Sequence, residues 1–282
     1  KIFWDHVYQK VLRKFAPGGR IAWEEHSTSY YDKRYIHPDV VVAGGGPAGI
    51  SAALAAADMG AKVTLVEMEA ELGGHIRWGD PVDGSNIAPL IDRIESHKNV
   101  EILLDSTVTG RYDHNWVAIM QRSHPIARER LIKARTGTLI VAPGLIERPY
   151  VFKGNDIPGV MLSGGVRRLI NLWAVKPGER AVVFTANQEG DACIEDLRRV
   201  GVEIAAVVDA RNGETIVSAE GKKRVRSVTL QSGEKVEADL VVIATGWTAP
   251  TSLLNMAGDK PEYDKGAARF FPTSLPSEVL AT

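Results

Sequence analysis

The chain has 282 residues, 44% of them hydrophobic and 24% charged, and its formal net charge is −1. This composition is typical of a globular protein of one large or two modest domains, and it offers no basic surface for nucleic acid. Apolar runs reach only strand length, so no membrane span is predicted. The single cysteine, Cys193, excludes an internal disulfide, a Cys-x-x-Cys redox pair and a cysteine-held iron–sulfur cluster. We therefore expect a cytoplasmic protein without nucleic-acid or membrane partners.

The first segment of the chain is predicted to be a helix followed by a connector. Residues 2–15 carry apolar side chains at helical spacing, and Pro17-Gly18-Gly19 ends this pattern. A polar connector with several tyrosines then leads to His37-Pro38. Because the chain opens on Lys1 rather than Met, and Leu275–Thr282 shows no element, we expect the sequence to be part of a longer protein.

From residue 39 the pattern becomes strand, glycine turn, helix, strand. Asp39–Ala43 is almost wholly apolar, as a buried parallel strand should be, and Pro47 stands where a helix can begin. Lys62–Glu67 is the second predicted strand. Further strands are expected over residues 101–109, 115–120 and 138–142.

A second unit of the same kind follows. Strands are predicted over 180–185, 202–208 and 240–244, a helix over 191–200, and a hairpin over 224–238. This alternation predicts an α/β chain with a Rossmann-type FAD/NAD(P)-binding fold, made of two doubly wound βαβ units with the second inserted in the first. The expected division is a helix and connector over 1–36, a dinucleotide-binding domain over 37–150 and 239–282, and an inserted Rossmann-like domain over 151–238.

The run from Gly44 to Gly49 satisfies the G-x-G-x-x-G pattern in the strand–helix context that this pattern requires. Gly44 makes the tight turn, Gly46 lets the backbone approach a pyrophosphate, and Gly49 lets helix and strand pack closely. The start of the helix offers N–H groups and a positive dipole end to the phosphates. The predicted contributors from this loop are Gly44, Gly45, Gly46, Pro47, Ala48 and Gly49.

Glu67 closes the second strand, where a carboxylate accepts hydrogen bonds from the adenosine ribose. It would repel a 2′-phosphate, and no arginine neighbours it in the sequence, so NADP is disfavoured. Gly73 and Gly74, just beyond Glu67 in the sequence, would let the chain pass close to the pyrophosphate. The turns at Ala142-Pro143-Gly144 and Ala244-Thr245-Gly246 each end an apolar strand and are expected beside the dinucleotide-binding domain. The remaining predicted cofactor-binding residues are Met68, Gly73, Gly74, His75, Val108, Ala142 and Gly144.

The second unit departs from the glycine pattern. Thr185 and Asn187 stand where the first two required glycines should be, and Glu189 would repel phosphate. We therefore expect this unit to bind no nucleotide. Neither a metal-ligand cluster nor a catalytic set can be argued from spacing, and Cys193 is expected to be a core residue. No catalytic residue and no metal are predicted in this chain.

Several longer segments resemble the α subunit of heterotetrameric sarcosine oxidase. These are Tyr31–Tyr35 leading through His37 into the glycine loop, Glu147–Phe152, Asn155–Met161, Lys176–Thr185 and Val207–Arg211. The resemblance covers about residue 30 to the end. It implies a dinucleotide, usually NAD, in this chain, with Gly44, Gly46, Ala48, Glu67 and Gly74 lining its pocket. The family's α subunit also has an earlier start and a folate-binding aminomethyltransferase-like domain, which this sequence lacks.

The resemblance further implies a multisubunit oxidoreductase acting on CH–NH donors. Its flavin-bearing β subunit would hold FAD and oxidise N-methyl or secondary amino acids, an FMN would lie between subunits, and small subunits would complete the assembly. The leading hypothesis is thus an NAD-binding α subunit, or a fragment of one, that is not catalytic alone. Two alternatives stay open at this point. One is a self-contained FAD-dependent reductase that uses NADH, and the other is a non-catalytic scaffold stabilised by NAD.

Overall fold

The computed structural model describes residues 3–15, 30–79 and 86–282. It separates the chain into two units, residues 1–30 and 31–282. In the first unit a π-helix, Trp4–Tyr8, continues into α1, Gln9–Phe15, which confirms the helix predicted over residues 2–15. The rings of Trp4 and Tyr8 stack at 5.2 Å. No residue of α1 is buried within this unit.

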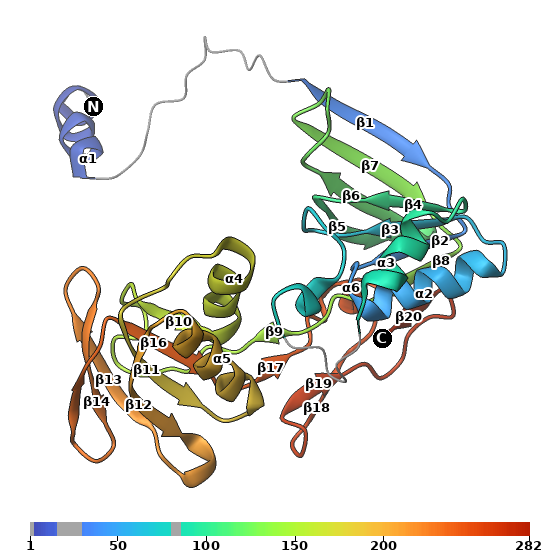
Figure 1. The fold of residues 1–282 in the computed structure, drawn as a ribbon. Coiled ribbons are helices and arrows are strands. Elements are labelled where there is room, and N and C mark those ends of the chain that lie inside the picture. Colours follow the sequence, from blue (N-terminus) through green and yellow to red (C-terminus); the bar gives the residue numbers. More distant parts are fainter. Residues whose placement is uncertain (1–2, 16–29, 80–85) are drawn as a thin grey trace. The chain divides into compact units, whose positions relative to one another are not determined.

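The second unit contains a five-stranded parallel sheet in the order β20-β8-β2-β3-β4 (Figure 1). Its strands are β2 (Val40–Ala43), β3 (Val63–Val66), β4 (Val100–Leu103), β8 (Thr138–Val141) and β20 (Val279–Ala281). Helices α2 (Pro47–Asp58) and α3 (Ala88–Glu95) cover one face. The buried residues of α2 are mostly small, so its backbone packs closely on the sheet.

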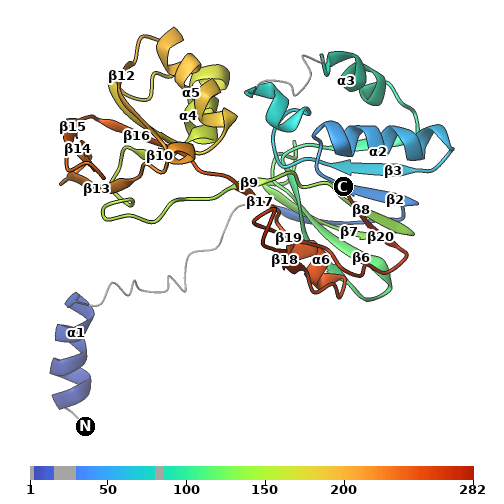
Figure 2. The same ribbon diagram turned by 90° about the horizontal axis from the view of Figure 1, so that it is seen from below.

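A second sheet, in the order β1-β7-β6-β5, covers the other face (Figure 2). Its strands are β1 (Tyr31–Ile36), β5 (Ser106–Tyr112), β6 (Trp116–Gln121) and β7 (Glu129–Arg135). Residues 31–36, expected to be a connector, instead form a strand parallel to β7. Two of the less exposed positions of β1, Asp32 and Arg34, are charged, so the sequence shows no alternation of apolar and polar residues there. We call these two sheets and their helices the first lobe.

The second lobe, residues 160–244, has its own parallel sheet in the order β10-β16-β11-β12. Its strands are β10 (Val160–Leu162), β11 (Arg180–Thr185), β12 (Glu203–Asp209) and β16 (Leu240–Ala244). Helices α4 (Ser163–Trp173) and α5 (Gln188–Arg199) pack on one face. An antiparallel sheet of β13 (Ile216–Gly221), β14 (Val225–Leu230) and β15 (Lys235–Glu237) packs on the other.

One predicted strand lies in a different sheet from the one expected. Leu240–Ala244 was assigned to the dinucleotide-binding domain, but β16 pairs with β10 and β11 in the second lobe. All five of its residues are buried there, so its apolar character fits either sheet equally. The chain returns to the first lobe only after β17 (Trp247–Thr248), which pairs with β9 (Ile146–Glu147).

The end of the described chain completes the first sheet. After α6 (Ser252–Met256) and a hairpin of β18 (Glu262–Asp264) and β19 (Arg269–Phe271), the three residues of β20 pair with β8. The expectation that Leu275–Thr282 forms no element was therefore wrong, because three residues are too few to give a sequence pattern. The observed topology confirms a doubly wound α/β fold whose second parallel sheet is inserted, in sequence, between strands of the first.

Candidate functional site

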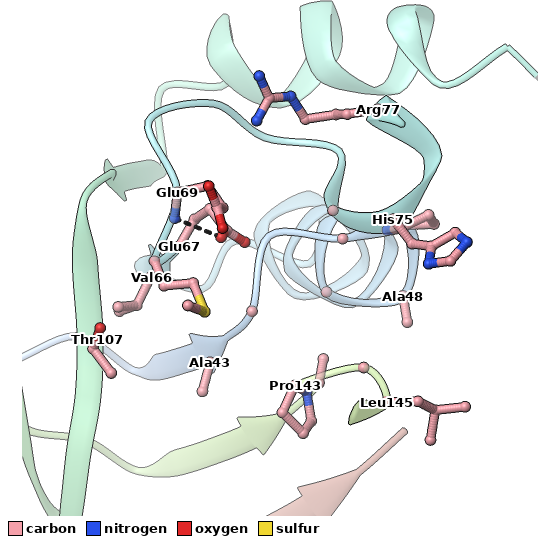
Figure 3. A pocket seen from close by; sticks show the side chains of 18 of the residues that line it. Ala43, Ala48, Val66, Glu67, Glu69, His75, Arg77, Thr107, Pro143 and Leu145 are labelled. Atoms are coloured by element: carbon pink, nitrogen blue, oxygen red, sulfur yellow. Dashed lines mark hydrogen bonds between the residues drawn. The ribbon is translucent and has the colours of Figure 1, made fainter. Parts of the chain in front are cut away.

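A cavity of about 430 Å³ opens where the carboxyl ends of β2, β3 and β8 meet the start of α2 (Figure 3). In an open parallel sheet, ligands bind outside the carboxyl ends of the strands. The volume lies within the range of about 300 to 1,000 Å³ that small-molecule sites occupy. Both the position and the size of this cavity therefore suit a nucleotide.

The glycine loop keeps one side of the cavity free of side chains. Gly44 has φ of +115°, and a Cβ there would collide with the carbonyl oxygen of Ala142. A Cβ on Gly49 would collide with the carbonyl oxygen of Gly44, so helix and turn are in direct backbone contact. Gly46 is the N-cap of α2 and gives that helix no side-chain cap. The helix start thus presents backbone N–H groups and a positive dipole end at the cavity.

Glu67, directly after β3, is held in place by the backbone. Its side chain is buried, its Oε2 accepts a hydrogen bond from the N–H of Gly45 at 2.7 Å, and its Oε1 accepts one from the N–H of Glu69 at 2.8 Å. These two bonds fix the carboxylate at the end of β3, where ribose hydroxyls bind in dinucleotide folds. Lone pairs that remain on the two oxygens can accept further bonds.

Two predicted residues support the cavity without lining it. Gly45 lies behind the loop and donates to Glu67, and a Cβ there would press on Leu72 and Glu67. Gly73 has φ of +117° and donates to the carbonyl oxygen of Gly45 at 2.9 Å. The other predicted positions all line the cavity: Gly44, Gly46, Pro47, Ala48, Gly49, Glu67, Met68, Gly74, His75, Val108, Ala142 and Gly144. That they bind nucleotide stays a prediction.

The close approach of two backbone segments confirms why glycines recur here. A Cβ on Gly74 would stand 3.0 Å from the Cα of Gly46. Gly74 itself has φ of +55°. A Cβ on Gly46, by contrast, would meet nothing nearer than the Cα of Gly74 at 4.0 Å. The space beside Gly46 is therefore open, as a pyrophosphate needs.

Sequence reasoning missed several lining residues. Arg168 and Leu172 reach the cavity from α4 of the second lobe, and Leu253 and Thr282 come from other distant segments. Nothing in the local sequence links these positions to the glycine loop, because the topology alone brings them together. Glu69 was also missed, although it lies only two residues beyond Glu67.

Two arginines line the cavity, and each is paired with a glutamate. Nη2 of Arg168 lies 2.7 Å from Oε1 of Glu69, and Nη2 of Arg77 lies 2.7 Å from Oε2 of Glu71. No arginine neighbours Glu67 in the sequence, but Arg168 shares its cavity. The Arg168–Glu69 pair joins the two lobes beside Glu67.

His75 contacts aromatic and acidic residues at the other end of the loop. Its ring centroid lies 4.1 Å from that of Trp78 and 5.5 Å from that of Trp247. Its Nε2 lies 3.7 Å from a carboxylate oxygen of Glu189 in the second lobe. His75 is thus placed between the nucleotide loop and the second βαβ unit.

In the second lobe, the polar side chains of the turn at Thr185–Gly190 form hydrogen bonds with the backbone of the same turn. The hydroxyl of Thr185 donates to the carbonyl oxygen of Asn187 at 2.8 Å, and Oδ1 of Asn187 accepts from the N–H of Glu189 at 3.0 Å. Asn187 is the N-cap of α5, the position that Gly46 holds on α2. The N–H groups that a nucleotide would use are therefore partly satisfied by the protein.

A buried ion cluster lies behind this turn. Arg167, only 2% exposed, pairs with Glu189 at 2.8 Å and Asp196 at 2.7 Å. Burial opposes its charge, but the two carboxylates raise its pKa further above the ordinary value. Cys193 is fully buried nearby, and burial raises the pKa of its thiol to about 12. This confirms Cys193 as a core residue.

Comparisons with known proteins agree with this geometry. Residues 39–140 match the family described as FAD dependent oxidoreductase. The chain is 32% identical to sarcosine oxidase subunit alpha from Rhizobium meliloti (strain 1021), over 96% of this chain and 31% of that subunit. The same subunit from Corynebacterium sp. (strain P-1) is 32% identical, over 86% of this chain and 30% of the subunit.

These relatives confirm the resemblance to sarcosine oxidase α subunits, and the chain spans about a third of their length. Among solved structures, L-proline dehydrogenase from P. horikoshii is 21% identical with a TM-score of 0.75, covering 92% of this chain and 52% of that one. This likeness confirms the FAD/NAD-binding fold. The chain is therefore an oxidoreductase homologue whose relatives are subunits of larger enzymes. No helix in the described part of the chain is long and apolar enough to cross a membrane.

Proposed function

We propose that this chain holds the ADP half of NAD as the nucleotide-binding α subunit, or a part of it, of a sarcosine-oxidase-like complex. The observation that carries this proposal is the cradle formed by Gly46, the uncapped start of α2 and Glu67. Glycine leaves room for the pyrophosphate, helix N–H groups face it, and the fixed carboxylate meets the ribose. The residues present thus fit a dinucleotide.

We further propose that amine oxidation takes place elsewhere in the assembly. A flavin-bearing β subunit would hold FAD and oxidise an N-methyl or secondary amino acid, with FMN between subunits and small subunits as further partners. In this chain the one cysteine is a buried thiol, and no group of three or more His, Cys, Asp or Glu in the described segments could hold a metal. A cytoplasmic location is part of the proposal. So is the predicted domain division, changed in two places: residues 31–36 (β1) join the dinucleotide-binding domain, and the inserted domain of 151–238 extends to include β16.

The second candidate is a self-contained FAD-dependent reductase that uses NADH. The match of residues 39–140 to FAD dependent oxidoreductases favours FAD in the same cradle. Such an enzyme also needs an NADH site in the second lobe. In the corresponding turn Asn187 caps α5 and Glu189 pairs with Arg167, which argues against it. A third possibility is a scaffold that NAD only stabilises.

Denaturing the purified chain and identifying the released nucleotide by absorbance and chromatography separates these candidates. Colourless NAD supports the proposal. Release of yellow FAD, together with bleaching of the native protein by NADH, would contradict the proposal and support the FAD-dependent reductase. If NAD is released, the assembled complex carrying Gly46→Asn decides about the scaffold: unchanged turnover with a lowered melting temperature would favour a purely stabilising role.

A further inference from the structure

The cavity contains two cationic side chains, and the acidic segment after β3 pairs with both. Glu69 holds Arg168, and Glu71 holds Arg77. The two pairs differ in their surroundings. The side chains of Glu69 and Arg168 are 30% and 36% exposed, whereas that of Glu71 is 71% exposed. Solvent therefore screens the Glu71 pair more strongly than the Glu69 pair.

Glu69 also lies directly beside the ribose position. Its backbone N–H donates to Oε1 of Glu67 at 2.8 Å, as the dashed line in Figure 3 shows. Its side chain then extends to the guanidinium of Arg168. Glu67, Glu69 and Arg168 are thus linked in one chain of contacts, in which the arginine is already paired.

A 2′-phosphate on the adenosine ribose would need a cation at this end. Arginine is the residue that normally accommodates that phosphate, through paired charge-assisted hydrogen bonds. Arg168 is the arginine that lines the cavity next to Glu69, but Glu69 competes for its donors. An incoming phosphate would therefore have to displace Glu69 while also facing the charge of Glu67.

We propose that Glu69 is a specificity-determining residue, which keeps the site closed to 2′-phosphorylated nucleotides by occupying Arg168. The inference rests on the proposed function, since it requires that the cavity holds the ADP half of a dinucleotide. It does not depend on whether that dinucleotide is NAD or FAD. Removal of the Glu69 charge frees Arg168 for the phosphate and creates a site for it.

The test is calorimetric titration with two probes that differ only in the phosphate, ADP-ribose and ADP-ribose 2′-phosphate. The wild-type chain should prefer ADP-ribose by about tenfold or more, and Glu69→Gln should reduce or reverse this preference by a similar factor. The gain should shrink with added salt, because it comes from an ion pair. The matched control, Glu71→Gln, frees Arg77 instead and should change the preference less than Glu69→Gln does, because solvent screens the Glu71 pair more strongly.

A double variant, Glu69→Gln with Arg168→Gln, shows whether Arg168 takes the phosphate. It should lose the gained binding of ADP-ribose 2′-phosphate and keep that of ADP-ribose. An unchanged preference in Glu69→Gln, or a double variant equal to the single one, would overturn the inference alone. If the folded wild-type chain binds neither probe, the proposed function itself fails. Thermal melting of each variant verifies that it is folded.

Discussion

The two βαβ turns of this chain share the same backbone arrangement but differ in the side chains at the start of the helix. In each, an N-cap residue in extended conformation starts a helix after a buried parallel strand. In the first lobe that residue is Gly46, and the space in front of the helix is open. In the second lobe it is Asn187, whose side chain accepts from the N–H of Glu189, and the carboxylate of Glu189 pairs with buried Arg167. The comparison shows that a few side chains decide whether the start of the helix after a Rossmann turn stays uncapped and open or is capped by the turn itself.

The largest expected effect comes from the second turn. Replacing Arg167 with Met leaves Glu189 and Asp196 without their buried counter-ion, and this should lower the free energy of unfolding by about 3 kcal/mol. Denaturant titration measures the change. The control is Arg198→Met, because the exposed Arg198–Glu195 pair should contribute less than about 1 kcal/mol. Equal effects for both variants would contradict a structural role for the cluster.

The next effect tests the first turn by making it resemble the second. Gly46→Asn should weaken nucleotide binding by about 100-fold, because the side chain enters the pyrophosphate space. Stability of the unliganded chain should be unchanged or rise by a few tenths of a kcal/mol, since Asn is a good N-cap. Calorimetric titration and thermal melting measure the two quantities. Undiminished binding would show that the pyrophosphate does not lie beside Gly46.

A smaller effect concerns the carboxyl group that connects β9 to the second lobe. Glu147 accepts from the hydroxyl of Ser163 and, at 2.8 Å, from the N–H of Gly164 at the start of α4. Burial raises the pKa of Glu147 despite these bonds. The folded protein therefore holds this proton more tightly than the unfolded one, so the contribution of Glu147 to stability falls as pH rises through and above its ordinary pKa of about 4.3.

Glu147→Gln should remove this pH dependence. The difference in stability between variant and wild type should shift in favour of Gln between about pH 4 and neutrality, by less than about 1 kcal/mol because the site is partly solvated. Melting curves across this pH range provide the measurement. A difference that does not change with pH would show that Glu147 ionises as easily in the folded state as in the unfolded one.

The smallest effect is an absence of reaction. With a pKa near 12 and no exposure, the Cys193 thiol on α5 should not react with a thiol reagent at pH 8 in the native protein, and should react once the protein is denatured. Spectrophotometric thiol titration in both states measures this. Rapid labelling of the native protein would mean that α5 opens easily behind the second turn.

The local pattern was sufficient for most of the fold and for the centre of the site. Strands at 180–185 and 240–244 were predicted with their observed bounds, and the glycine loop with Glu67 was found from spacing and residue type. These features are determined by residues close together in the sequence, so the local sequence pattern is enough to predict them. Which sheet β16 joins depends on partners far away in the chain, and its uniformly buried residues fit either sheet.

The same limit applies to the site. Arg168 enters the cavity only because α4 of an inserted lobe packs beside the first, and no spacing in the sequence encodes that approach. β1 was missed because two of its less exposed residues, Asp32 and Arg34, are charged, and its hydrogen-bonding partner, β7, lies about a hundred residues away. Predictions thus succeeded where the physical cause was local and failed where it was topological.

The pairing of β20 with β8 has a consequence for synthesis on the ribosome. Every strand of the second lobe lies within residues 160–244, so this lobe can form as soon as that stretch has emerged. The first sheet must wait for residues 279–281 before its last strand is in place. The cavity, which Thr282 also lines, therefore gains this part of its wall only after the residues of the inserted lobe have been synthesised.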